Sequence, residues 1–476
     1  MDEGEHMFFK SDLDIVGNAL ERYYEESVSG EKTTINQLPL KEIINKLDLA
    51  YYIKKGNLTG DKLSIFMEKY LEVTTRLHSQ NFLAHQIAVP HYSGALASLA
   101  DGFTNNIKAI YELGPGSTSI DYFLINWFLK KIGWCEAPTD LNVKDNFGKF
   151  GGGIFTHGGS LANLTALIAA RTKTIPGVWE SGNPDNLAIL TSHSIHYSIE
   201  RAAGIIGIGQ NSIYYLDSNS NGSIIPDRID ETYNRVIKDN KIPIALVANG
   251  GCTAVGRYDS LEEIGIFCND KNLWFHVDGA HGASVLLSDK YRYLLNGISR
   301  ADSVTWDAHK LLRTPSLCTA LLFKNHMYID HAFKQEASYL FHNKEQPGVD
   351  FANRTIECSS SGLGLKLFMV LGAMGEDGLS KYIDRQIQLT YDAYEYIKTM
   401  PGFKCAVKPQ NNILCFRVDG SDQLQLNIRD ELIREGNYYV SSTLFKKVRY
   451  LRLVITNPDS DMENIRQLIE KIKELI

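Results

Sequence analysis

Two short apolar runs, each followed by ionisable residues, constrain the fold of this chain more than any other feature. Residues 273–277 lead into Asp278, and residues 301–306 lead into Asp307-Ala308-His309-Lys310. Apolar runs of this length predict buried strands. Open α/β sheets bind their ligands at the carboxyl ends of their strands. We therefore expect Asp278 and Lys310 to meet at one ligand site.

A glycine-rich turn at residues 151–160 precedes both runs, and residues 161–171 after it are rich in strong helix formers. The turn is therefore expected to open a helix. Backbone N–H groups converge at such a helix start, which suits a phosphate dianion, and Ser160 adds a hydroxyl donor. The turn matches neither the lysine-bearing nucleotide loop nor the GxGxxG pattern. Because most glycine-rich turns bind nothing, its value lies in its position before the two strands.

A third segment, residues 189–204, combines an apolar strand, a turn containing His193 and His196, and a helix. A flat imidazole can stack on an aromatic ring and transfer a proton, although turn histidines are as often structural. Taken alone, Asp278 would be a helix cap or loop ligand more often than a cofactor partner. Lys310 alone would be a solvated lysine. The combination of the three segments changes these odds.

Together these motifs resemble the group II pyridoxal-phosphate-dependent amino-acid decarboxylases, the family of glutamate, aromatic amino-acid and 2,4-diaminobutyrate decarboxylases. The resemblance extends from roughly residue 81 to the C-terminus. It implies the type I, aspartate-aminotransferase-like fold, which is an α/β fold. A large domain would hold a mostly parallel sheet, and a small C-terminal domain would be α+β. It also implies pyridoxal 5'-phosphate as the cofactor.

The resemblance assigns catalytic roles to four residues. Lys310 would be the Schiff-base lysine, and Asp278 would hold the proton on the pyridinium nitrogen so that the ring accepts electrons. His196 would stack on one face of the ring. Tyr339 resembles the mobile-loop tyrosine that protonates the carbanion after decarboxylation.

The resemblance assigns the remaining cofactor contacts to residues on either side of these four. Gly159, Ser160 and His309 would hold the phosphate. Ala280 would cover the second face of the ring, and Thr253 stands where the family has a cofactor-contacting threonine.

Some positions depart from the family pattern. Asp307-Ala308 stand where the family often has Asn-Pro, and together with residues 277–282 this variant is similar to the diaminobutyrate-type bacterial members. Glu357-Cys358 resembles the same branch, whereas residues 359–361 are serines where many members carry basic residues. The family's aromatic enzymes have aromatic residues before the proline that corresponds to Pro90. Residues 88 and 89 are Ala and Val here, which disfavours an aromatic substrate.

The expected reaction is the decarboxylation of an L-amino acid of the diaminobutyrate or glutamate/aspartate type, which makes the chain a carboxy-lyase. His91, Tyr92 and Arg354 are candidates for side-chain contacts with the substrate, with a structural role equally open. Alternative reactions on the same scaffold are those of a lyase or a decarboxylation-dependent oxidase. A catalytically silent homologue is disfavoured, because the site residues are intact.

Composition excludes several classes of partner. The net charge of −7 argues against binding to nucleic acid or to an anionic membrane. The acidic N-terminus and the lack of an apolar run of membrane-spanning length predict a cytoplasmic protein. The seven cysteines are scattered and form no CxxC pair, which predicts a reducing compartment and no metal site.

Three domains are expected. Residues 1–105 would form a helical segment, with helices at 11–26 and 41–52, that packs on a partner, because the resemblance implies a homodimer with shared active sites. Residues 106–367 would form the cofactor-binding domain and residues 368–476 the small domain. The strands expected in the large domain are 187–191, 212–216, 243–248, 273–277, 303–306 and 318–323. In the small domain, strands at 412–418 and 448–455 would accompany helices at 423–435 and 461–476.

Overall fold

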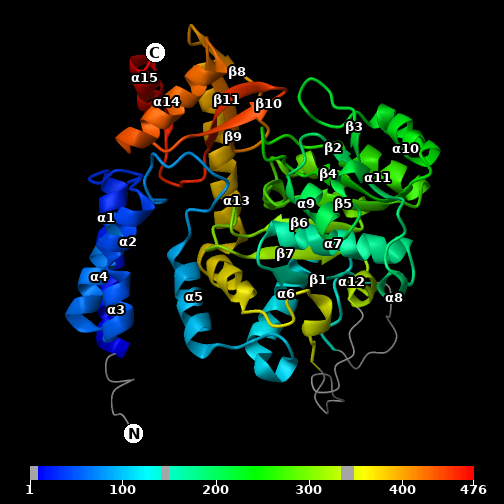
Figure 1. The fold of residues 1–476 in the computed structure, drawn as a ribbon, viewed down its shortest axis with the longest axis horizontal. Helices are drawn as coiled ribbons and strands as arrows, with labels where there is room; N and C mark the ends of the chain where they lie inside the picture. The colour runs from blue at the N-terminus through cyan, green and yellow to red at the C-terminus, as the bar shows by residue number, and fades with distance from the viewer. Residues whose placement is uncertain (1–8, 141–149, 334–347) are drawn as a thin grey trace. The chain divides into compact units, whose positions relative to one another are not determined.

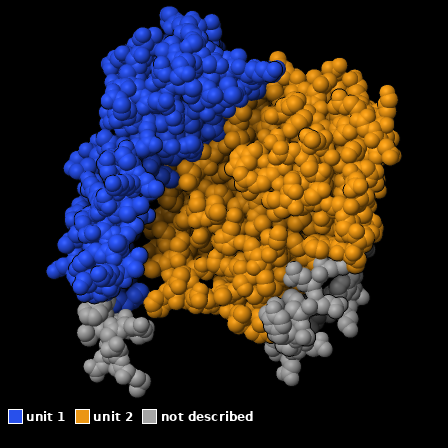
Figure 2. All heavy atoms as spheres, viewed as in Figure 1, with its two compact units in different colours: residues 1–85, 389–408, 413–476 blue, residues 86–388, 409–412 orange. Residues whose placement is uncertain are grey.

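The computed structural model describes residues 9–140, 150–333 and 348–476 (Figure 1). The chain divides into two compact units, coloured separately in Figure 2. Unit 1 comprises residues 1–85, 389–408 and 413–476, and unit 2 comprises residues 86–388 and 409–412. The three-domain division expected from the sequence stays a prediction.

Unit 2 is built on a seven-stranded sheet with the strand order β1-β7-β6-β5-β4-β2-β3. The strands are β1 (Gly152–Thr156), β2 (Leu187–Ser192), β3 (Ile213–Leu216), β4 (Ile242–Asn249), β5 (Trp274–Asp278), β6 (Ser303–Asp307) and β7 (Thr319–Phe323). The strands from β3 to β6 pair in parallel, whereas β7 is antiparallel to both β6 and β1. The mostly parallel sheet expected from the sequence is therefore confirmed.

Helices cover this sheet, which explains why its strands are buried along nearly their whole length. The helices of unit 2 are α5 (Tyr92–Thr104), α6 (Pro115–Ile132), α7 (Gly159–Thr174), α8 (Val178–Ser181), α9 (Ser198–Ile205), α10 (Ile229–Lys238), α11 (Leu261–Asp270), α12 (Met327–Ala332) and α13 (Leu363–Ile397), of which α13 continues into unit 1 beyond residue 388. Buried residues of α7, α9 and α12 share one apolar core with residues of the sheet. The central helix α7 is buried along residues 162–170.

The glycine-rich segment differs from the sequence expectation. Residues 152–156 form the edge strand β1 rather than part of a turn. A Cβ atom on Gly153 would lie 2.5 Å from the carbonyl oxygen of Leu321 in β7, so a side chain there would block the pairing. The turn itself is confined to His157 and Gly158, where Gly158 takes a φ of 103° that L side chains rarely adopt.

Unit 1 combines four N-terminal helices with a small antiparallel sheet. The helices are α1 (Phe9–Ser29), α2 (Leu40–Leu47), α3 (Leu49–Lys55) and α4 (Gly60–Glu72). The sheet has the order β10-β11-β9-β8, with β8 (Phe403–Cys405), β9 (Ile413–Val418), β10 (Ser441–Phe445) and β11 (Val448–Val454). Helices α14 (Asp422–Glu435) and α15 (Met462–Glu474) contribute to its core. The expected α+β character of the C-terminal part is confirmed.

The expectation of one helix over residues 41–52 is wrong. Asp48 adopts a left-handed conformation with a φ of 55° and separates α2 from α3. Aspartate tolerates this conformation better than most residues, because its short polar side chain can hydrogen-bond locally. Across the described residues, the structure contains no helix whose length and apolar character would suit a membrane span.

Candidate active site

A pocket of about 260 Å³ lies in unit 2, where β4, β5 and β6 end in Asn249, Asp278 and Asp307. It brings together eight residues singled out from the sequence: Gly159, Ser160, His196, Thr253, Asp278, Ala280, His309 and Lys310. Tyr339 lies outside the described residues. A ligand pocket at the carboxyl ends of parallel strands is the arrangement that open α/β sheets favour.

A row of polar side chains lines the face of β5 and β6 that helix α7 covers. Because side chains alternate along a strand, His276 and Asp278 point to the same face of β5. The parallel register with β6 places Ser303 beside His276 and Thr305 beside Asp278. All four side chains are buried, so each needs a hydrogen-bond partner inside the protein.

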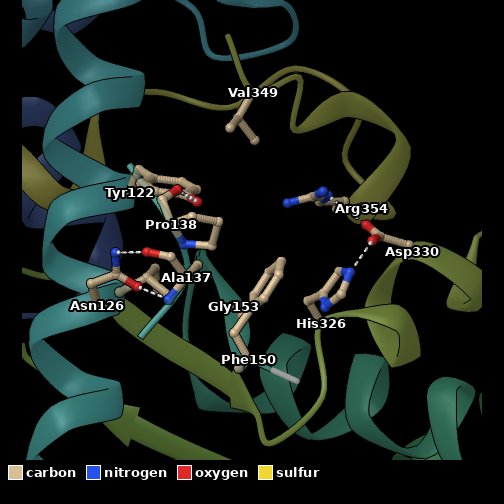
Figure 3. Close-up of a pocket in the computed structure, with 13 residues that line it drawn as sticks. Tyr122, Asn126, Ala137, Pro138, Phe150, Gly153, His326, Asp330, Val349 and Arg354 are labelled. Carbon is tan, nitrogen blue, oxygen red and sulfur yellow. Dashed lines mark hydrogen bonds and ion pairs between the residues drawn. The ribbon is translucent and has the colours of Figure 1, made fainter. Parts of the chain in front are cut away.

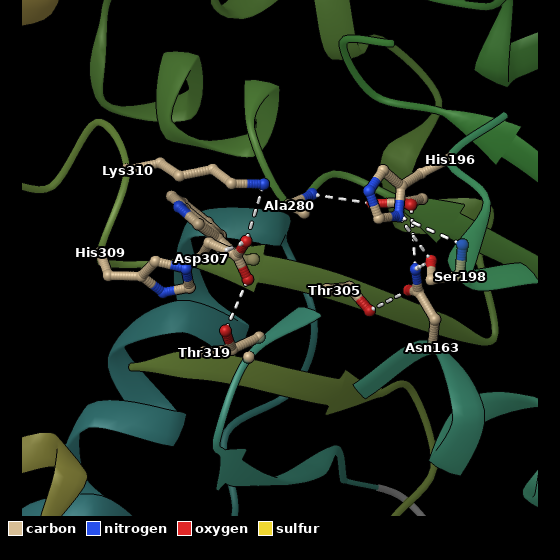
Figure 4. Close-up of polar contacts among 12 residues, drawn as sticks. Asn163, His196, Ser198, Ala280, Thr305, Asp307, His309, Lys310 and Thr319 are labelled. Carbon is tan, nitrogen blue, oxygen red and sulfur yellow. Dashed lines mark hydrogen bonds and ion pairs between the residues drawn. The ribbon is translucent and has the colours of Figure 1, made fainter. Parts of the chain in front are cut away.

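Asn163, on α7, connects this row to the helix that covers it (Figure 4). Its Nδ2 donates to Oδ2 of Asp278 at 2.9 Å and to Oγ of Ser198 at 3.0 Å. Its Oδ1 lies 3.0 Å from Nε2 of His276 and accepts from the hydroxyl of Thr305 at 2.8 Å. Both donors and both acceptor sites of the amide are therefore used, which fixes its orientation.

The same network assigns the tautomer of His276. Its Nε2 donates to Oδ1 of Asn163, and its Nδ1 faces Oγ of Ser303 at 2.8 Å. That hydroxyl already accepts from the indole N–H of Trp274 at 2.9 Å, so it donates to Nδ1. Burial lowers the pKa of His276 to about 4, against the opposing effect of Asp278. His276 is thus neutral and serves as a relay of hydrogen bonds toward Asp278.

Asp278 receives a second hydrogen bond from the backbone N–H of Ala280, at 3.2 Å from its Oδ1. Two donors hold the carboxylate and leave acceptor capacity directed at the pocket, which Asp278 lines. Such a carboxylate suits a ring nitrogen that carries a proton.

His196 lines the pocket on the other side of this network. Its Nδ1 accepts from the backbone N–H of Ser198 at 3.3 Å and lies 2.9 Å from the Ser198 hydroxyl. Burial lowers the pKa of His196, and the positive charge of Lys310 acts in the same direction. A neutral imidazole held in this way offers a flat surface for an aromatic ligand.

Lys310 belongs to a second polar cluster, separated from the first in Figure 4. Its Nζ lies 2.8 Å from Oδ2 of Asp307, and the hydroxyl of Thr319 donates to Oδ1 at 2.5 Å. His309 Nε2 is 3.7 Å from the same carboxylate, while its Nδ1 lies 2.9 Å from the carbonyl oxygen of Cys318. Gly159 and Ser160, the first residues of α7, complete this end of the pocket.

The residues proposed to contact the substrate side chain, among them His91 and Arg354, do not lie together in the structure. The backbone N–H groups of Ala88 and His91 donate to the carbonyl oxygens of His309 and Arg313, so the segment containing His91 runs beside the Lys310 loop. Arg354 lies elsewhere. It lines a different pocket beside Tyr122 and His326, where its Nε is 2.8 Å from Oδ1 of Asp330 (Figure 3).

Several polar pocket residues have no role in the sequence-based prediction, among them Asn163, Asn249, Asp307, His157 and His281. Asn163 had a signal, because it is a polar residue one helical turn after Ser160 inside the apolar helix. In the sequence, Asp307 stands out only as a departure from the family pattern. Asn249 ends β4 as Asp278 ends β5, and its Nδ2 donates to Ser192 and to the buried Asp259.

The sheet order and the lysine and aspartate at neighbouring strand ends define a pyridoxal-phosphate enzyme of fold type I. A family profile described as "Pyridoxal-dependent decarboxylase conserved domain" matches residues 54–419. The chain belongs to this family of decarboxylases, and pyridoxal 5'-phosphate is its cofactor. The buried carboxylate of Asp278, the Lys310 amine and the N-terminus of α7 fit the three functional parts of that cofactor.

Individual relatives agree with this assignment. The chain is 30% identical over 478 residues to the acidic amino acid decarboxylase GADL1 of Homo sapiens, covering 95% of this chain and 88% of that protein. It is 26% identical over 446 residues to L-2,4-diaminobutyrate decarboxylase of Acinetobacter baumannii, covering 88% and 84%. The crystal structure of mouse CSAD has a TM-score of 0.90 at 23% identity and covers 99% of both chains.

Replacing Asn163 by leucine is expected to weaken binding of the cofactor by roughly ten- to a hundredfold, since a hydrogen bond to a charged group is worth roughly 1.5–3 kcal/mol. The carboxylate of Asp278 would lose its side-chain donor. Titration of the cofactor-stripped protein with pyridoxal phosphate measures the dissociation constant. Thr305→Val is the matched control, because it removes a partner of Asn163 but leaves the bond to Asp278. Equal affinities of the two variants would contradict this role of Asn163.

The buried His276 predicts a pH-dependent stability. In the unfolded chain the imidazole has its ordinary pKa of 6.5, whereas in the folded protein its pKa is about 4. Between these two pH values only the unfolded chain binds the proton. The free energy of unfolding should therefore fall as the pH drops through this window, by on the order of 3 kcal/mol. Urea denaturation at a series of pH values measures this. His276→Gln should show a shallower pH dependence, and identical profiles would refute the assignment.

Proposed function

We propose that the substrate is an L-amino acid with an acidic side chain, of the glutamate or aspartate type. The observation that carries this proposal is that two histidines without a role in holding the cofactor, His157 and His281, line the pocket. An imidazole can donate a hydrogen bond to a side-chain carboxylate. The name of the human relative, an acidic amino acid decarboxylase, supports the same class.

2,4-Diaminobutyrate is the second candidate. The relative from Acinetobacter baumannii is named as the decarboxylase of this amino acid. The residues Asp307-Ala308 and Glu357-Cys358 also resemble that branch. Glu357 contacts a residue of the pocket lining, because its Oε1 is 2.6 Å from Nδ1 of His157.

We propose that Lys310 holds the cofactor through Nζ and that Asp278 keeps the proton on its ring nitrogen. When bound, pyridoxal phosphate supplies a ring that takes up the electron pair released as the α-carboxylate leaves. His196 orients the ring from one face and Ala280 from the other. Gly159, Ser160 and His309 hold the phosphate, and Thr253 adds a further contact.

After carbon dioxide has left, a proton must return to the substrate's Cα. We assign this transfer to Tyr339 on the strength of the family resemblance. Exclusion of water from the pocket would favour this protonation over the competing lyase and oxidase outcomes.

Carbon-dioxide release from a panel of amino acids tests the reaction and the substrate class. We expect release from glutamate, aspartate or a close acidic analogue, and a visible absorbance band from the cofactor bound to Lys310. Lys310→Ala should lose both, because no other amine lines the pocket among the described residues. Lys324→Ala, at an exposed position, is the control and should retain them. Release from diaminobutyrate alone would favour the second candidate, and a band without any release would favour another reaction.

We also propose that the enzyme is a homodimer in which the partner completes the active site. Helix α5 presents an apolar stripe at helical spacing: Tyr92, Leu96, Leu99 and Phe103 are 70, 51, 42 and 61% exposed. A contiguous apolar face of this kind typically marks an interface. The stripe begins next to His91, whose segment runs beside the Lys310 loop, so a second copy seated on it would reach the pocket entrance. The predicted cytoplasmic location and the packing of residues 1–105 on the partner stay proposals.

Changing both Leu96 and Phe103 to glutamate should convert the dimer to a monomer, because charges would be buried at the contact. Sedimentation velocity measures the mass. Ile237→Glu, on α10, is the matched control. Ile237 is 49% exposed, which is similar to Leu96, but it is not part of the stripe. An unchanged dimer in the double variant would remove α5 from the interface.

A further inference from the structure

Asp307 is a buried carboxylate at the end of β6. It has no role in the proposed decarboxylation. Its side chain is 2% exposed. Nζ of Lys310 and the hydroxyl of Thr319 contact its two oxygens, and Figure 4 shows all three in one cluster. Its backbone N–H donates to the carbonyl oxygen of Ala280 at 3.1 Å, so the strand end holds the residue in place.

This carboxylate lies directly against the start of α7. A Cβ atom on Gly159 would be 3.1 Å from Oδ1 and 3.3 Å from Oδ2 of Asp307. The first N–H groups of a helix have no intrahelical partner and attract anions. Asp307 therefore stands beside the position where the proposed function places the cofactor phosphate.

Several elements face Asp307. Its own loop contributes Lys310 and His309, β7 contributes the neutral hydroxyl of Thr319, and α7 contributes its N-terminus. The turn before α9 contributes His196, and the buried thiol of Cys318 lies just before β7; the charge of Asp307 acts to raise the pKa of both groups. Burial alone would raise the pKa of Asp307, but the charges of Lys310 and His309 outweigh it and hold the pKa below its ordinary value. The carboxylate is thus ionised, and a phosphate dianion beside it meets a like charge that is buried from solvent.

We propose that Asp307 sets the strength with which the site holds the cofactor phosphate. Its carboxylate repels the dianion, so loading of the cofactor is coupled to uptake of a proton by the pocket. Lys310 and His309 balance the carboxylate when the phosphate is absent. This inference rests on the proposed position of the phosphate at Gly159, Ser160 and His309.

The test compares two ligands on cofactor-stripped protein by equilibrium dialysis: pyridoxal 5'-phosphate and 5'-deoxypyridoxal. The second has the same ring and aldehyde but no phosphate, so the ratio of the two dissociation constants isolates the contribution of the phosphate. In Asp307→Asn we expect this ratio to change about tenfold in favour of the phosphate ligand, because one like charge is removed. An unchanged ratio, or a change in the opposite direction, would overturn the proposal.

Asp278→Asn is the matched control. It also removes one carboxylate from the pocket, but it acts on the ring nitrogen that both ligands share. We expect weaker binding of both ligands and an unchanged ratio. A ratio that rises equally in both variants would show a general effect of pocket charge and would overturn a specific role of Asp307.

A second measurement uses the unaltered protein and does not depend on the folding of a variant. Calorimetric titrations at pH 8, in two buffers of different ionisation enthalpy, count the protons taken up on binding. We expect more protons with the phosphate ligand than with 5'-deoxypyridoxal, and equal uptake would overturn the coupling. If neither ligand binds the unaltered protein, the proposed cofactor site fails as well. Normal binding without any dependence on Asp307 would refute this inference alone.

Discussion

The hydrogen bonds of Asn163 are the interaction on which the organisation of this site depends. They join α7 to the ends of β5 and β6 and leave no donor or acceptor of the amide unused. Inside a protein an unpaired polar group raises the free energy of the folded state. The hydrogen-bonded side chains of β5 and β6 are therefore stable only when all of them have partners. The same side chains hold the helix whose first residues, Gly159 and Ser160, line the opposite end of the pocket.

Two neighbouring strand ends carry carboxylates with different surroundings. Asp278 receives uncharged donors, an amide and a backbone N–H, and turns its remaining acceptor capacity to the pocket. Asp307 faces the ammonium group of Lys310, the imidazole of His309 and the hydroxyl of Thr319. The environments therefore separate the tasks of two chemically identical groups, which is how a single pocket supports several electrostatic roles. We assign Asp278 to the ring of the cofactor and Asp307 to its phosphate.

Much of this site was predictable because strands and glycine turns leave local signals. The apolar runs before Asp278 and Lys310 correctly predicted β5 and β6, and the chemistry of the family supplied candidate partners for the cofactor. His276 and Asn163 were harder to recognise, since a single polar residue in an apolar run does not reveal what it contacts. Arg354 is an error of the opposite kind. The sequence made it a candidate for contact with the substrate, whereas in the structure it pairs with Asp330 in another pocket.

The sequence by itself determined the strands from β2 to β7, the ionisable groups that follow β5 and β6, and the resemblance of the chain to the pyridoxal-phosphate decarboxylases. These properties follow from local periodicity and from residue types at short spacing. The tertiary structure alone decided that Ser303 lies beside His276, that Asn163 reaches Asp278, and that Asp307 stands against Gly159. Each of these contacts depends on strand register and on the packing of a helix across the sheet. Both are set by residues distant in sequence, because burial of the whole apolar core determines them.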